Sequence, residues 1–381
     1  MNFMFSMPTL VRFGCGVSGQ IGAALYDAGF RRIFFVYDSG VRAAGLVDPV
    51  AEALKTAGLQ YQEYGEVLAD TLDYQVREAV ELAADFASDA IVALGGGSVM
   101  DLAKGVNILL SNPSPIHAYE GMNKAGSPAG PLYVVPTTAG SGSEVSGVAV
   151  VTDVKAKRKM ALCGRYIAPT VALADPELAL SLPEALTAST GTAALGRALE
   201  SCLSVSSSPF TEPLALEATR LIMGSLRKAF ADGKDIGARG DMLLGSMLAA
   251  SGFAAVPGLA HAMALALGAC CGVAYGLGNA LMLSHVMEFN IPAVSPEKMR
   301  LLARAAGLAS HGKSPEALGR ELADALAALA KDLGIPRIRE LGVPKDLLPA
   351  LAEAAMREPS ARSSPRAPSV AELIALYEKA W

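Results

Sequence analysis

Three consecutive glycines near residue 95 give the clearest sign of chemistry in the sequence. Ala90–Leu94 is apolar, Gly95–Gly97 follow, and Ser98 opens a helical pattern. A strand that enters a helix through glycines brings main-chain N–H groups and the positive end of the helix dipole to one point, with no side chain in the way. The stretch predicts a phosphate-binding turn. Its spacing differs from the Rossmann G-x-G-x-x-G, and a βα connection without a ligand is the alternative.

Two other stretches place polar groups directly after an apolar strand pattern. Asp38 follows RIFFVY (32–37), and its carboxylate suits the hydroxyls of an adenosine ribose and repels a 2′-phosphate, which favours NAD over NADP. An Asp at this place is equally suited to cap the next helix. Residues 136–143, PTTAGSGS, supply hydroxyls and main-chain N–H groups with little side-chain bulk. They form either a cofactor-binding loop or an ordinary polar loop.

The first half of the chain must hold these stretches at one edge of a sheet. Helical patterns there alternate with apolar strand patterns, which lie at 10–13, 32–37, 90–94, 132–135 and 170–174. This alternation predicts a parallel, Rossmann-like sheet covered on both faces, with ligands at the carboxyl ends of the strands. Segments 147–152 and 159–163 are expected to form a hairpin over the sheet edge, with Lys159 near its end.

From residue 183 onward the pattern is helical. Helices are expected at 185–205, 212–231, 236–251, 296–306, 314–332, 347–357 and in a last segment that opens with the capping box Ser369-Val370-Ala371-Glu372. The change places a boundary near residue 180. We expect an α/β dinucleotide-binding domain over 1–180 and an all-helical domain over 181–381.

Composition narrows the function and the location. A net charge of −5 without a basic cluster excludes a typical nucleic-acid binder. Five cysteines without C-x-x-C spacing, and an N-terminus unlike a signal peptide, predict a cytoplasmic protein. Residues 242–287 carry no Asp, Glu, Lys or Arg, but glycines, serines, Pro257, His261 and Asn279 interrupt them, which favours core helices over a membrane span. The apolar helical surface predicts a homodimer or a higher homo-oligomer.

Five motifs over nearly the whole chain resemble the iron-containing, group III alcohol dehydrogenases. They are GGGSVMDLAK (95–104), VVPTTAGSGSEVSGVAVVTD (134–153), DPELALSLPEALTASTG (175–191), YGLGNALMLSHVMEFN (275–290) and SPRAPSVAELIALY (364–377). The resemblance implies a dehydroquinate synthase-like architecture, with a nucleotide-binding α/β domain, an all-helical domain and a divalent metal at the cleft between them. It also implies reversible NAD(P)-linked interconversion of a small alcohol and its aldehyde or ketone.

The resemblance also implies the cofactor contacts, by matching motif positions. Asp38 matches the position that sets NAD preference, and Lys159 matches a lysine near the cofactor. The remaining implied cofactor-binding residues are Gly95, Gly96, Gly97 and Ser98 at the pyrophosphate, Thr137, Thr138 and Ser141 at the nicotinamide and ribose, and Asp101.

The metal ligands of the family are largely replaced in this sequence. The family pattern has Asp and His four residues apart on a helix, the first His of H-x-x-x-H, and another His before G-L-x-N. Here Ala193 and Arg197 stand in the first pair, His261 is kept while Leu265 follows it, and Tyr275 replaces the last ligand. A catalytic divalent ion ordinarily needs three protein ligands, so we expect no metal at this position.

The replacements suggest a different chemistry. Arg197 brings a permanent positive charge that is suited to an oxyanion, or to a carboxylate, sulfonate or phosphonate of the substrate. Tyr275 and His261 are suited to donating a proton to an alkoxide. In the alternative, Arg197 pairs with a carboxylate such as Glu200, and the other two side chains only fill space.

Two functions therefore stay open. The first is an NAD(H)-dependent alcohol dehydrogenase or aldehyde reductase that needs no metal and acts on a small, anionic aldehyde or ketone, with Arg197, His261 and Tyr275 as catalytic residues. The second is a non-catalytic nucleotide-binding relative that serves as a binding or partner subunit. The intact glycine, threonine and lysine positions favour the enzyme.

Overall fold

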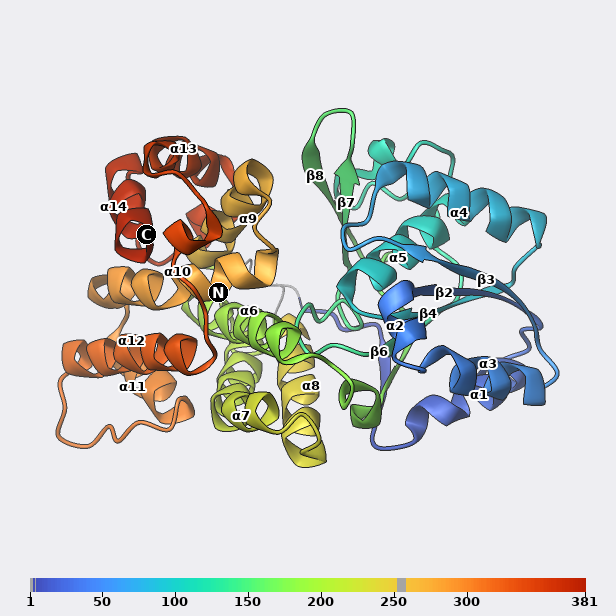
Figure 1. Ribbon diagram of the computed structural model, residues 1–381, viewed down its shortest axis with the longest axis horizontal. Helices are drawn as coiled ribbons and strands as arrows, with labels where there is room; N and C mark the ends of the chain where they lie inside the picture. Colours follow the sequence, from blue (N-terminus) through green and yellow to red (C-terminus); the bar gives the residue numbers. More distant parts are fainter. Residues whose placement is uncertain (1–2, 4, 252–257) are drawn as a thin grey trace. The chain divides into compact units, whose positions relative to one another are not determined.

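A computed structural model describes residues 3, 5–251 and 258–381 of the 381-residue chain (Figure 1). Pro257, one of the residues that interrupt the apolar run, lies outside the described residues. The chain divides into two compact units. One is Met7–Leu182, and the other is Pro183–Trp381 together with the described residues before Met7.

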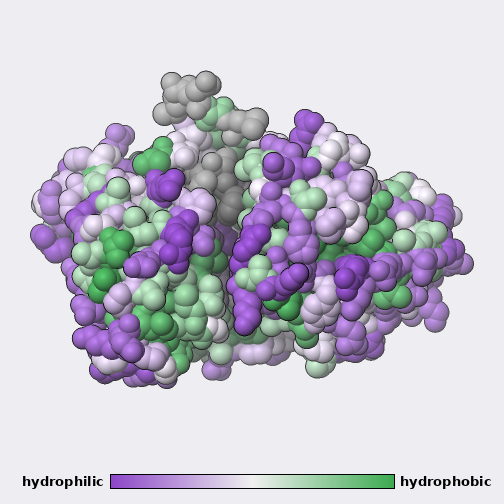
Figure 2. All heavy atoms as spheres, turned by 90° about the horizontal axis from the view of Figure 1, so that it is seen from above, coloured by the Kyte–Doolittle hydropathy of each residue, from purple (hydrophilic) through white to green (hydrophobic). Residues whose placement is uncertain are grey.

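Among the described residues, no helix combines the length and the apolar composition that a membrane crossing requires. Hydrophilic residues are spread over much of the face seen in Figure 2, with hydrophobic residues among them. The charge-free run that begins at Met242 belongs to three separate helices in its described part, which is the arrangement expected for a helical core.

The unit Met7–Leu182 is built on a parallel sheet, as the sequence predicted, and this sheet has six strands. The strand order is β1-β9-β6-β4-β2-β3. The bounds are β1 Leu10–Phe13, β2 Arg32–Asp38, β3 Gln60–Val67, β4 Ala90–Gly95, β6 Leu132–Pro136 and β9 Val171–Ala174.

Alternate residues of each strand pack on opposite faces of this sheet. Ile33 and Phe35 of β2 pack on the side of α1 (Ile21–Asp27) and α3 (Val47–Thr56). Phe34 and Val36 pack on the side of α4 (Asp73–Asp85) and α5 (Gly97–Ser111). Both faces are covered, which is why the strand is apolar throughout instead of alternating with polar residues.

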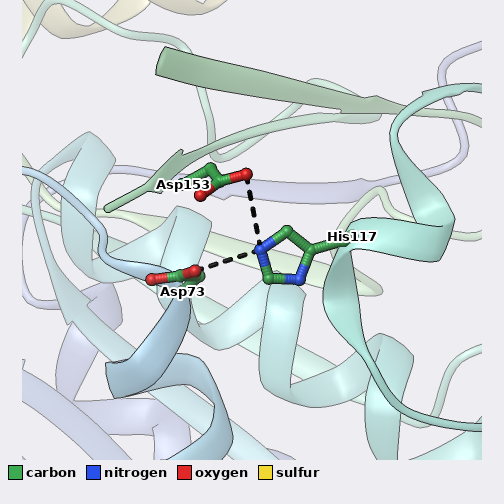
Figure 3. A group of neighbouring side chains, drawn as sticks. All are labelled: Asp73, His117 and Asp153. Atoms are coloured by element: carbon green, nitrogen blue, oxygen red, sulfur yellow. Dashed lines mark hydrogen bonds and ion pairs between the residues drawn. The ribbon is translucent and has the colours of Figure 1, made fainter. Parts of the chain in front are cut away.

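The predicted hairpin forms, but its placement differs from the expectation. Strands β7 (Val148–Asp153) and β8 (Arg158–Cys163) pair antiparallel, and β8 also pairs with the short β5 (Gly121–Met122) in a separate three-stranded sheet. Val151 and Met160 are fully buried in the same core as α5, so the hairpin packs over that helical layer and does not extend the edge of the main sheet. Asp153, at the end of β7, lies beside two other polar side chains (Figure 3).

All the regular elements described in the second unit are helical. The α-helices are α6 Glu184–Leu203, α7 Thr211–Ala231, α8 Ile236–Ser251, α9 Leu259–Cys271, α10 Tyr275–Asn290, α11 Pro296–Ala305, α12 Pro315–Asp332, α13 Leu348–Arg357 and α14 Val370–Ala380. The capping box predicted for the last of these is confirmed, because Ser369 and Glu372 bond reciprocally to each other's main-chain N–H.

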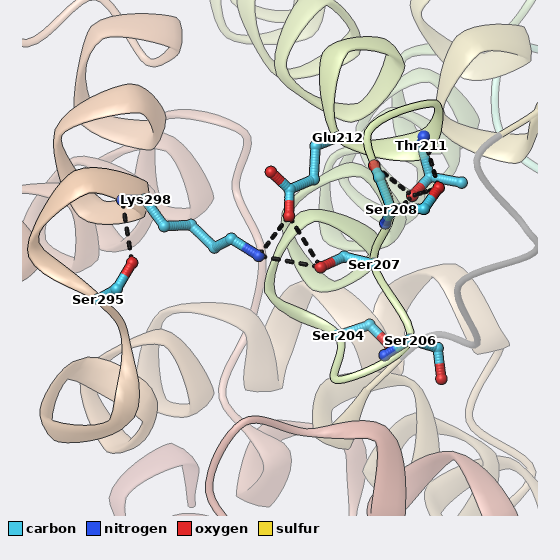
Figure 4. Close-up of polar contacts among 8 residues, drawn as sticks. All are labelled: Ser204, Ser206, Ser207, Ser208, Thr211, Glu212, Ser295 and Lys298. Atoms are coloured by element: carbon cyan, nitrogen blue, oxygen red, sulfur yellow. Dashed lines mark hydrogen bonds and ion pairs between the residues drawn. The ribbon is translucent and has the colours of Figure 1, made fainter. Parts of the chain in front are cut away.

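A cluster of polar side chains joins helices α7 and α11 (Figure 4). The Nζ atom of Lys298 on α11 lies 2.6 Å from Glu212 Oε1 in the first turn of α7, and donates to Ser207 Oγ at 2.9 Å. The carboxylate of Glu212 also interacts favourably with the positive end of the α7 dipole. This ion pair helps to fix the packing of α11 against α7.

Candidate active site

Strands β2 and β4 are neighbours at the point where the chain reverses its progress across the sheet. The strand that follows β2 in the chain, β3, lies to one side of it, whereas β4, β6 and β9 continue on the other side. Ligands of open parallel sheets bind outside the carboxyl ends of the strands at such a point. Asp38 ends β2 and Gly95 ends β4, so two of the predicted cofactor positions share this edge.

The glycine turn after β4 is packed closely against the loop after β6. Thr137 donates its main-chain N–H to the Gly95 carbonyl at 3.1 Å. A Cβ on Gly96 would lie 3.2 Å from the Thr138 side chain, and a Cβ on Gly97 would lie 2.9 Å from Ser141 Cβ. The predicted pyrophosphate and nicotinamide residues are therefore neighbours, and only glycine leaves the turn unobstructed.

Helix α5 begins directly at this turn. In the part of the chain that the structure describes, no side chain caps α5, whose N-cap residue is Gly96. The first N–H groups of the helix and its dipole are thus available to an anion. A small cradle of main-chain N–H groups fits the pyrophosphate of a dinucleotide.

Asp38 fulfils the capping alternative. Its Oδ1 atom accepts the Val41 N–H at 2.9 Å, and the one-turn helix α2 (Ser39–Ala43) begins directly after it. An Asp at an N-cap initiates a helix in this way. A carboxylate has two oxygens and several acceptor positions, so the cap leaves acceptor capacity for a ribose.

Lys159 and Ser98 contact the segment before α4. The Lys159 Nζ lies 2.7 Å from Asp70 Oδ1, and the Ser98 hydroxyl donates to the Ala69 carbonyl. Thr71 donates its hydroxyl to the Ser98 carbonyl at 2.9 Å. Residues 69–71 therefore support the first turn of α5 from the side.

A buried lysine lies further along α5. The Nζ of Lys104 donates to Ser143 Oγ at 2.6 Å, to the Ser146 carbonyl at 3.0 Å and to the Val148 carbonyl at 2.7 Å. Burial lowers the pKa of Lys104 to about 8, while the charges of nearby carboxylates act in the opposite direction. Sequence reasoning did not single out this residue, although a lysine within an apolar helical pattern is a signal for a paired buried charge.

Asp101 belongs to the same network. Its Oδ1 accepts the Ser143 hydroxyl at 2.6 Å, and its Oδ2 accepts the Val150 N–H at 2.9 Å. Both oxygens thus join α5 to the 136–143 loop and to β7. These contacts help to position the loop, and the cofactor contact that the resemblance implies for Asp101 stays a prediction.

In the helical unit, the three predicted catalytic residues lie together. His261 is in the first turn of α9 and Tyr275 is the first residue of α10. The His261 Nδ1 and the Tyr275 hydroxyl are 2.7 Å apart, and the rings meet edge to face. Arg197 on α6 is 6% exposed, and it lies near enough to the Tyr275 phenol to lower the pKa of that group.

Burial and the nearby charge of Arg197 set the pKa values of His261 and Tyr275. Burial, assisted by the charge of Arg197, lowers the pKa of His261 to about 3, so its imidazole is neutral at neutral pH. Burial raises the pKa of Tyr275, with Arg197 acting in the opposite direction, so the phenol keeps its proton. A neutral imidazole and a phenol beside a fixed cation can deliver a proton to an oxygen that gains negative charge.

A buried carboxylate holds His261 in position. Glu200 lies three residues after Arg197 on α6 and accepts the main-chain N–H groups of Gly258, Ala260 and His261, at 3.0, 2.5 and 3.2 Å. It therefore acts as the cap of α9. Burial raises the pKa of Glu200 to about 7, and the three N–H groups oppose this shift. The sequence offered Glu200 only as an alternative partner of Arg197.

Asn279 is a further polar group of this cluster. It is fully buried on α10, and a Cβ on Gly196 would lie 2.0 Å from its Oδ1, so α6 and α10 approach closely here. Among the described residues, neither atom of its amide has a hydrogen-bond partner of good geometry. It lies near enough to the Tyr275 phenol to lower the pKa of that group.

The donor set does not fit the divalent metal that the resemblance implies. The four positions hold Ala193, Arg197, His261 and Tyr275, which provide one imidazole, one phenol with a raised pKa and a buried cation. A divalent ion needs at least three neutral or anionic donors and is repelled by a guanidinium. No step can be assigned to a metal at these residues.

Comparison with known proteins establishes the family. Residues 8–176 match the family model described as iron-containing alcohol dehydrogenase, and residues 187–381 match the C-terminal model of the same family. The chain belongs to the iron-containing alcohol dehydrogenases. Membership makes it an oxidoreductase of the alcohol dehydrogenase or aldehyde reductase type.

Individual members of the iron-containing alcohol dehydrogenases match over the full chain. The lactaldehyde reductase of Escherichia coli (strain K12) is 33% identical over 373 residues, which is 97% of each chain. The NAD-dependent methanol dehydrogenase of Bacillus methanolicus is 32% identical over 378 residues, or 99% of each chain. A crystal structure of 1,3-propanediol oxidoreductase has a TM-score of 0.97 at 33% identity and covers 100% of both chains.

Proposed function

We propose that the protein is an NAD(H)-dependent oxidoreductase that interconverts a small, anionic alcohol and its aldehyde or ketone without the family's catalytic metal. The observation that carries this proposal is the hydrogen-bonded pair of His261 and Tyr275, with the buried Arg197 near both, at the positions of the family's metal ligands. A bound nicotinamide supplies or accepts the hydride. The protein residues must then stabilise and protonate the substrate oxygen.

Arg197 takes the place of the Lewis acid. As the carbonyl carbon receives a hydride, its oxygen becomes an alkoxide, and a preorganised cation in a buried setting stabilises that charge. Arg197 is buried, and its charge lowers the pKa of Tyr275, the phenol that is to give up a proton. A guanidinium stays charged at any working pH.

Tyr275 and His261 supply the proton. The Tyr275 O–H bond breaks as its proton forms the O–H bond of the alcohol, and the phenolate that remains takes a proton from His261 Nδ1, which lies 2.7 Å away. A proton from solvent is added at His261 Nε2 as the Nδ1 proton leaves, so the imidazole stays neutral and one proton is consumed for each hydride transferred. In the oxidising direction the same groups accept the proton of the alcohol.

The charge of Arg197 also supports an anionic substrate. A carboxylate, sulfonate or phosphonate forms two parallel hydrogen bonds with a guanidinium, and burial strengthens this attraction. Asn279, whose buried amide lacks a partner of good geometry among the described residues, offers a further donor. Both groups favour a short substrate with an oxygen-rich anionic end.

The cofactor turn supports NAD. The cradle at Gly96 and Gly97 suits a pyrophosphate, and Asp38 at the end of β2 carries a negative charge that disfavours a 2′-phosphate. A relative is an NAD-dependent methanol dehydrogenase, which is consistent with this choice. The turn and the neighbouring loop contain the residues that the resemblance implies for cofactor binding, namely Gly95–Ser98, Thr137, Thr138 and Ser141.

The proposal also includes a cytoplasmic location and a homo-oligomeric state. All five cysteines are free, which supports a reducing compartment and hence the cytoplasm. Leu10 and Phe13 on the edge strand β1 are 57% and 42% exposed, and such apolar side chains on a sheet edge support a homo-oligomer.

The proposal is tested by the initial rate of NADH oxidation with matched neutral and anionic small aldehydes and ketones. Chelator-treated protein is assayed in parallel with the same protein after addition of iron or zinc. Activity that survives chelation and is higher with the anionic member of each pair is expected. Activity that appears only with added metal contradicts the metal-free mechanism, and NADH binding without turnover moves the assignment to a binding subunit.

A further inference from the structure

A second polar cluster lies in the α/β unit, apart from the proposed catalytic residues. Asp73 begins α4, His117 lies in the short 3-10 helix Ile116–Tyr119, and Asp153 ends β7 (Figure 3). The Nε2 atom of His117 is 3.0 Å from Asp73 Oδ2 and 3.7 Å from Asp153 Oδ2. One donor atom from each of the three side chains lies within 4.8 Å of the others.

The 3.0 Å separation of His117 Nε2 and Asp73 Oδ2 is a hydrogen bond and also matches two ligands of one ion, while the 3.7 Å separation to Asp153 is slightly wider than that of tetrahedral ligands. Two donor atoms that each lie about 2.1 Å from a metal are roughly 3.0 Å apart at a right angle and roughly 3.4 Å apart at a tetrahedral angle. One imidazole nitrogen with two carboxylate oxygens is a donor set that suits zinc, iron and manganese. Over the described ranges of the chain, this is the one group of three or more His, Cys, Asp or Glu side chains with such spacing, and it includes no cysteine.

The two carboxylates are held in place by their other oxygens. Asp73 Oδ1 accepts the Tyr74 N–H at 2.9 Å, and Asp153 Oδ1 accepts the Ala156 N–H at 2.8 Å. Each residue therefore directs Oδ2 toward the imidazole. The side chains of Asp73 and Asp153 are only 15% and 12% exposed, whereas that of His117 is 40% exposed. The cluster is a largely preformed set of ligands with one side open to water.

We propose that Asp73, His117 and Asp153 bind one divalent first-row transition-metal ion, with Zn²⁺ as the probe of choice. Two partly buried carboxylates that face one imidazole attract a cation, and a metal ion satisfies all three groups at once. Water completes the coordination on the open side. This site is separate from the residues at the family's metal position and does not depend on the proposed reaction.

The ion joins three segments, and two of them, at Asp73 and Asp153, adjoin the contact that supports the cofactor turn. Thr152 donates its N–H to the Thr71 carbonyl at 2.7 Å, next to the two aspartates, and Thr71 donates its hydroxyl to the Ser98 carbonyl. A metal that ties Asp73 to Asp153 therefore stabilises the strand-like contact that holds the first turn of α5. The bound ion should raise the melting temperature of the protein as well as occupy the site.

The experiment measures zinc binding to chelator-treated, full-length protein. Isothermal titration calorimetry and elemental analysis after gel filtration give the affinity and the number of ions, and a thermal melt gives the shift. We expect one ion per chain and a higher melting temperature with zinc. His117→Ala and Asp73→Asn should each weaken binding by about tenfold or more and remove the shift.

Matched variants establish whether zinc binds at these three residues. Asp73→Asn keeps an oxygen for the Tyr74 N–H, so it tests the ligand without removing the local contact. His311→Ala, on an exposed histidine elsewhere, should bind zinc like the wild type. Failure to bind zinc, or equal binding by His117→Ala, overturns the inference. Zinc that is kept by His117→Ala and lost in His261→Ala overturns it in favour of the family's metal position, and contradicts the metal-free function as well.

Discussion

His261 Nδ1 and the Tyr275 hydroxyl lie 2.7 Å apart although 14 positions separate the two residues in the chain. Helix α9 ends at Gly272, whose φ of 68° is the left-handed conformation that glycine adopts without strain, and α10 starts three residues later. The hydrogen bond shows that the first turns of these two successive helices lie side by side. The cluster therefore depends on the turn between these helices as well as on its own side chains.

Replacing Arg197 with Ala should remove the proposed stabilisation of the substrate oxygen. We expect kcat/KM for carbonyl reduction to fall by about 10²- to 10³-fold, the loss typical of one oxyanion-stabilising donor. NADH affinity, measured by fluorescence titration, should stay unchanged. Arg197→Lys keeps a charge and should recover part of the activity. Wild-type turnover in Arg197→Ala would assign this residue a packing role only.

Removing the Tyr275 hydroxyl should slow protonation. Tyr275→Phe keeps the ring that packs against His261, and kcat should fall by roughly 10²- to 10⁴-fold, the usual contribution of a general acid. Tyr26→Phe, at an exposed tyrosine of α1, is the matched control and should behave as the wild type. An unchanged kcat in Tyr275→Phe would show that another group donates the proton.

Glu200→Gln should loosen the start of α9. An amide nitrogen would face main-chain donors that now bond to the carboxylate, and leaving one of them without an acceptor costs about 1 to 3 kcal/mol in unfolding free energy. The measurement is urea unfolding of wild type and variant at several pH values.

We also expect the stability difference between wild type and Glu200→Gln to depend on pH. The folded-state pKa of Glu200 is about 7, above its ordinary value of 4.5, so its contribution to stability is complete below pH 4.5 and declines as pH rises to about 7. The stability difference between wild type and Glu200→Gln should therefore narrow as pH rises through this window. His261 is present in both proteins, so its titration cancels in the difference. A difference that widens with pH would contradict the assigned shift.

Asp38→Asn separates the two roles of this residue. Asparagine keeps an oxygen for the Val41 N–H and so keeps the cap of α2, but it removes the charge. If the charge excludes a 2′-phosphate, kcat/KM with NADPH should rise about tenfold relative to NADH, which corresponds to about 1.4 kcal/mol. An unchanged ratio, with unchanged thermal stability, would leave Asp38 as a helix cap alone.

Gly97→Ala should obstruct the cofactor turn. Its Cβ would lie 2.9 Å from Ser141 Cβ, so the loop must move, and we expect NADH to bind about tenfold more weakly by calorimetry, a change of about 1.4 kcal/mol. Adding Ser141→Gly removes the obstructing atoms and should restore part of the affinity. Gly19→Ala, where a Cβ meets nothing within 4 Å, is the control. Normal affinity in Gly97→Ala would mean that the cofactor does not use this turn.

Much of the fold could be predicted from local sequence pattern. The strand before the glycines and helix α8 were predicted with bounds close or equal to those of the structure, because apolar periodicity and bordering glycine, proline or aspartate are local signals. The hairpin was predicted correctly as a pairing and wrongly in its placement, since placement depends on the whole core.

The sequence by itself determined the family, the glycine turn and the replacement of the family's metal ligands, because each is a matter of residue type at a motif position. Only the tertiary structure decided which distant side chains meet. Glu200 accepts an N–H 61 residues away, Lys104 donates to a carbonyl 44 residues away, and His117 contacts an aspartate at a separation of 44. No local period carries such partnerships, because they are set by how helices and strands pack, and packing depends on all the buried side chains together.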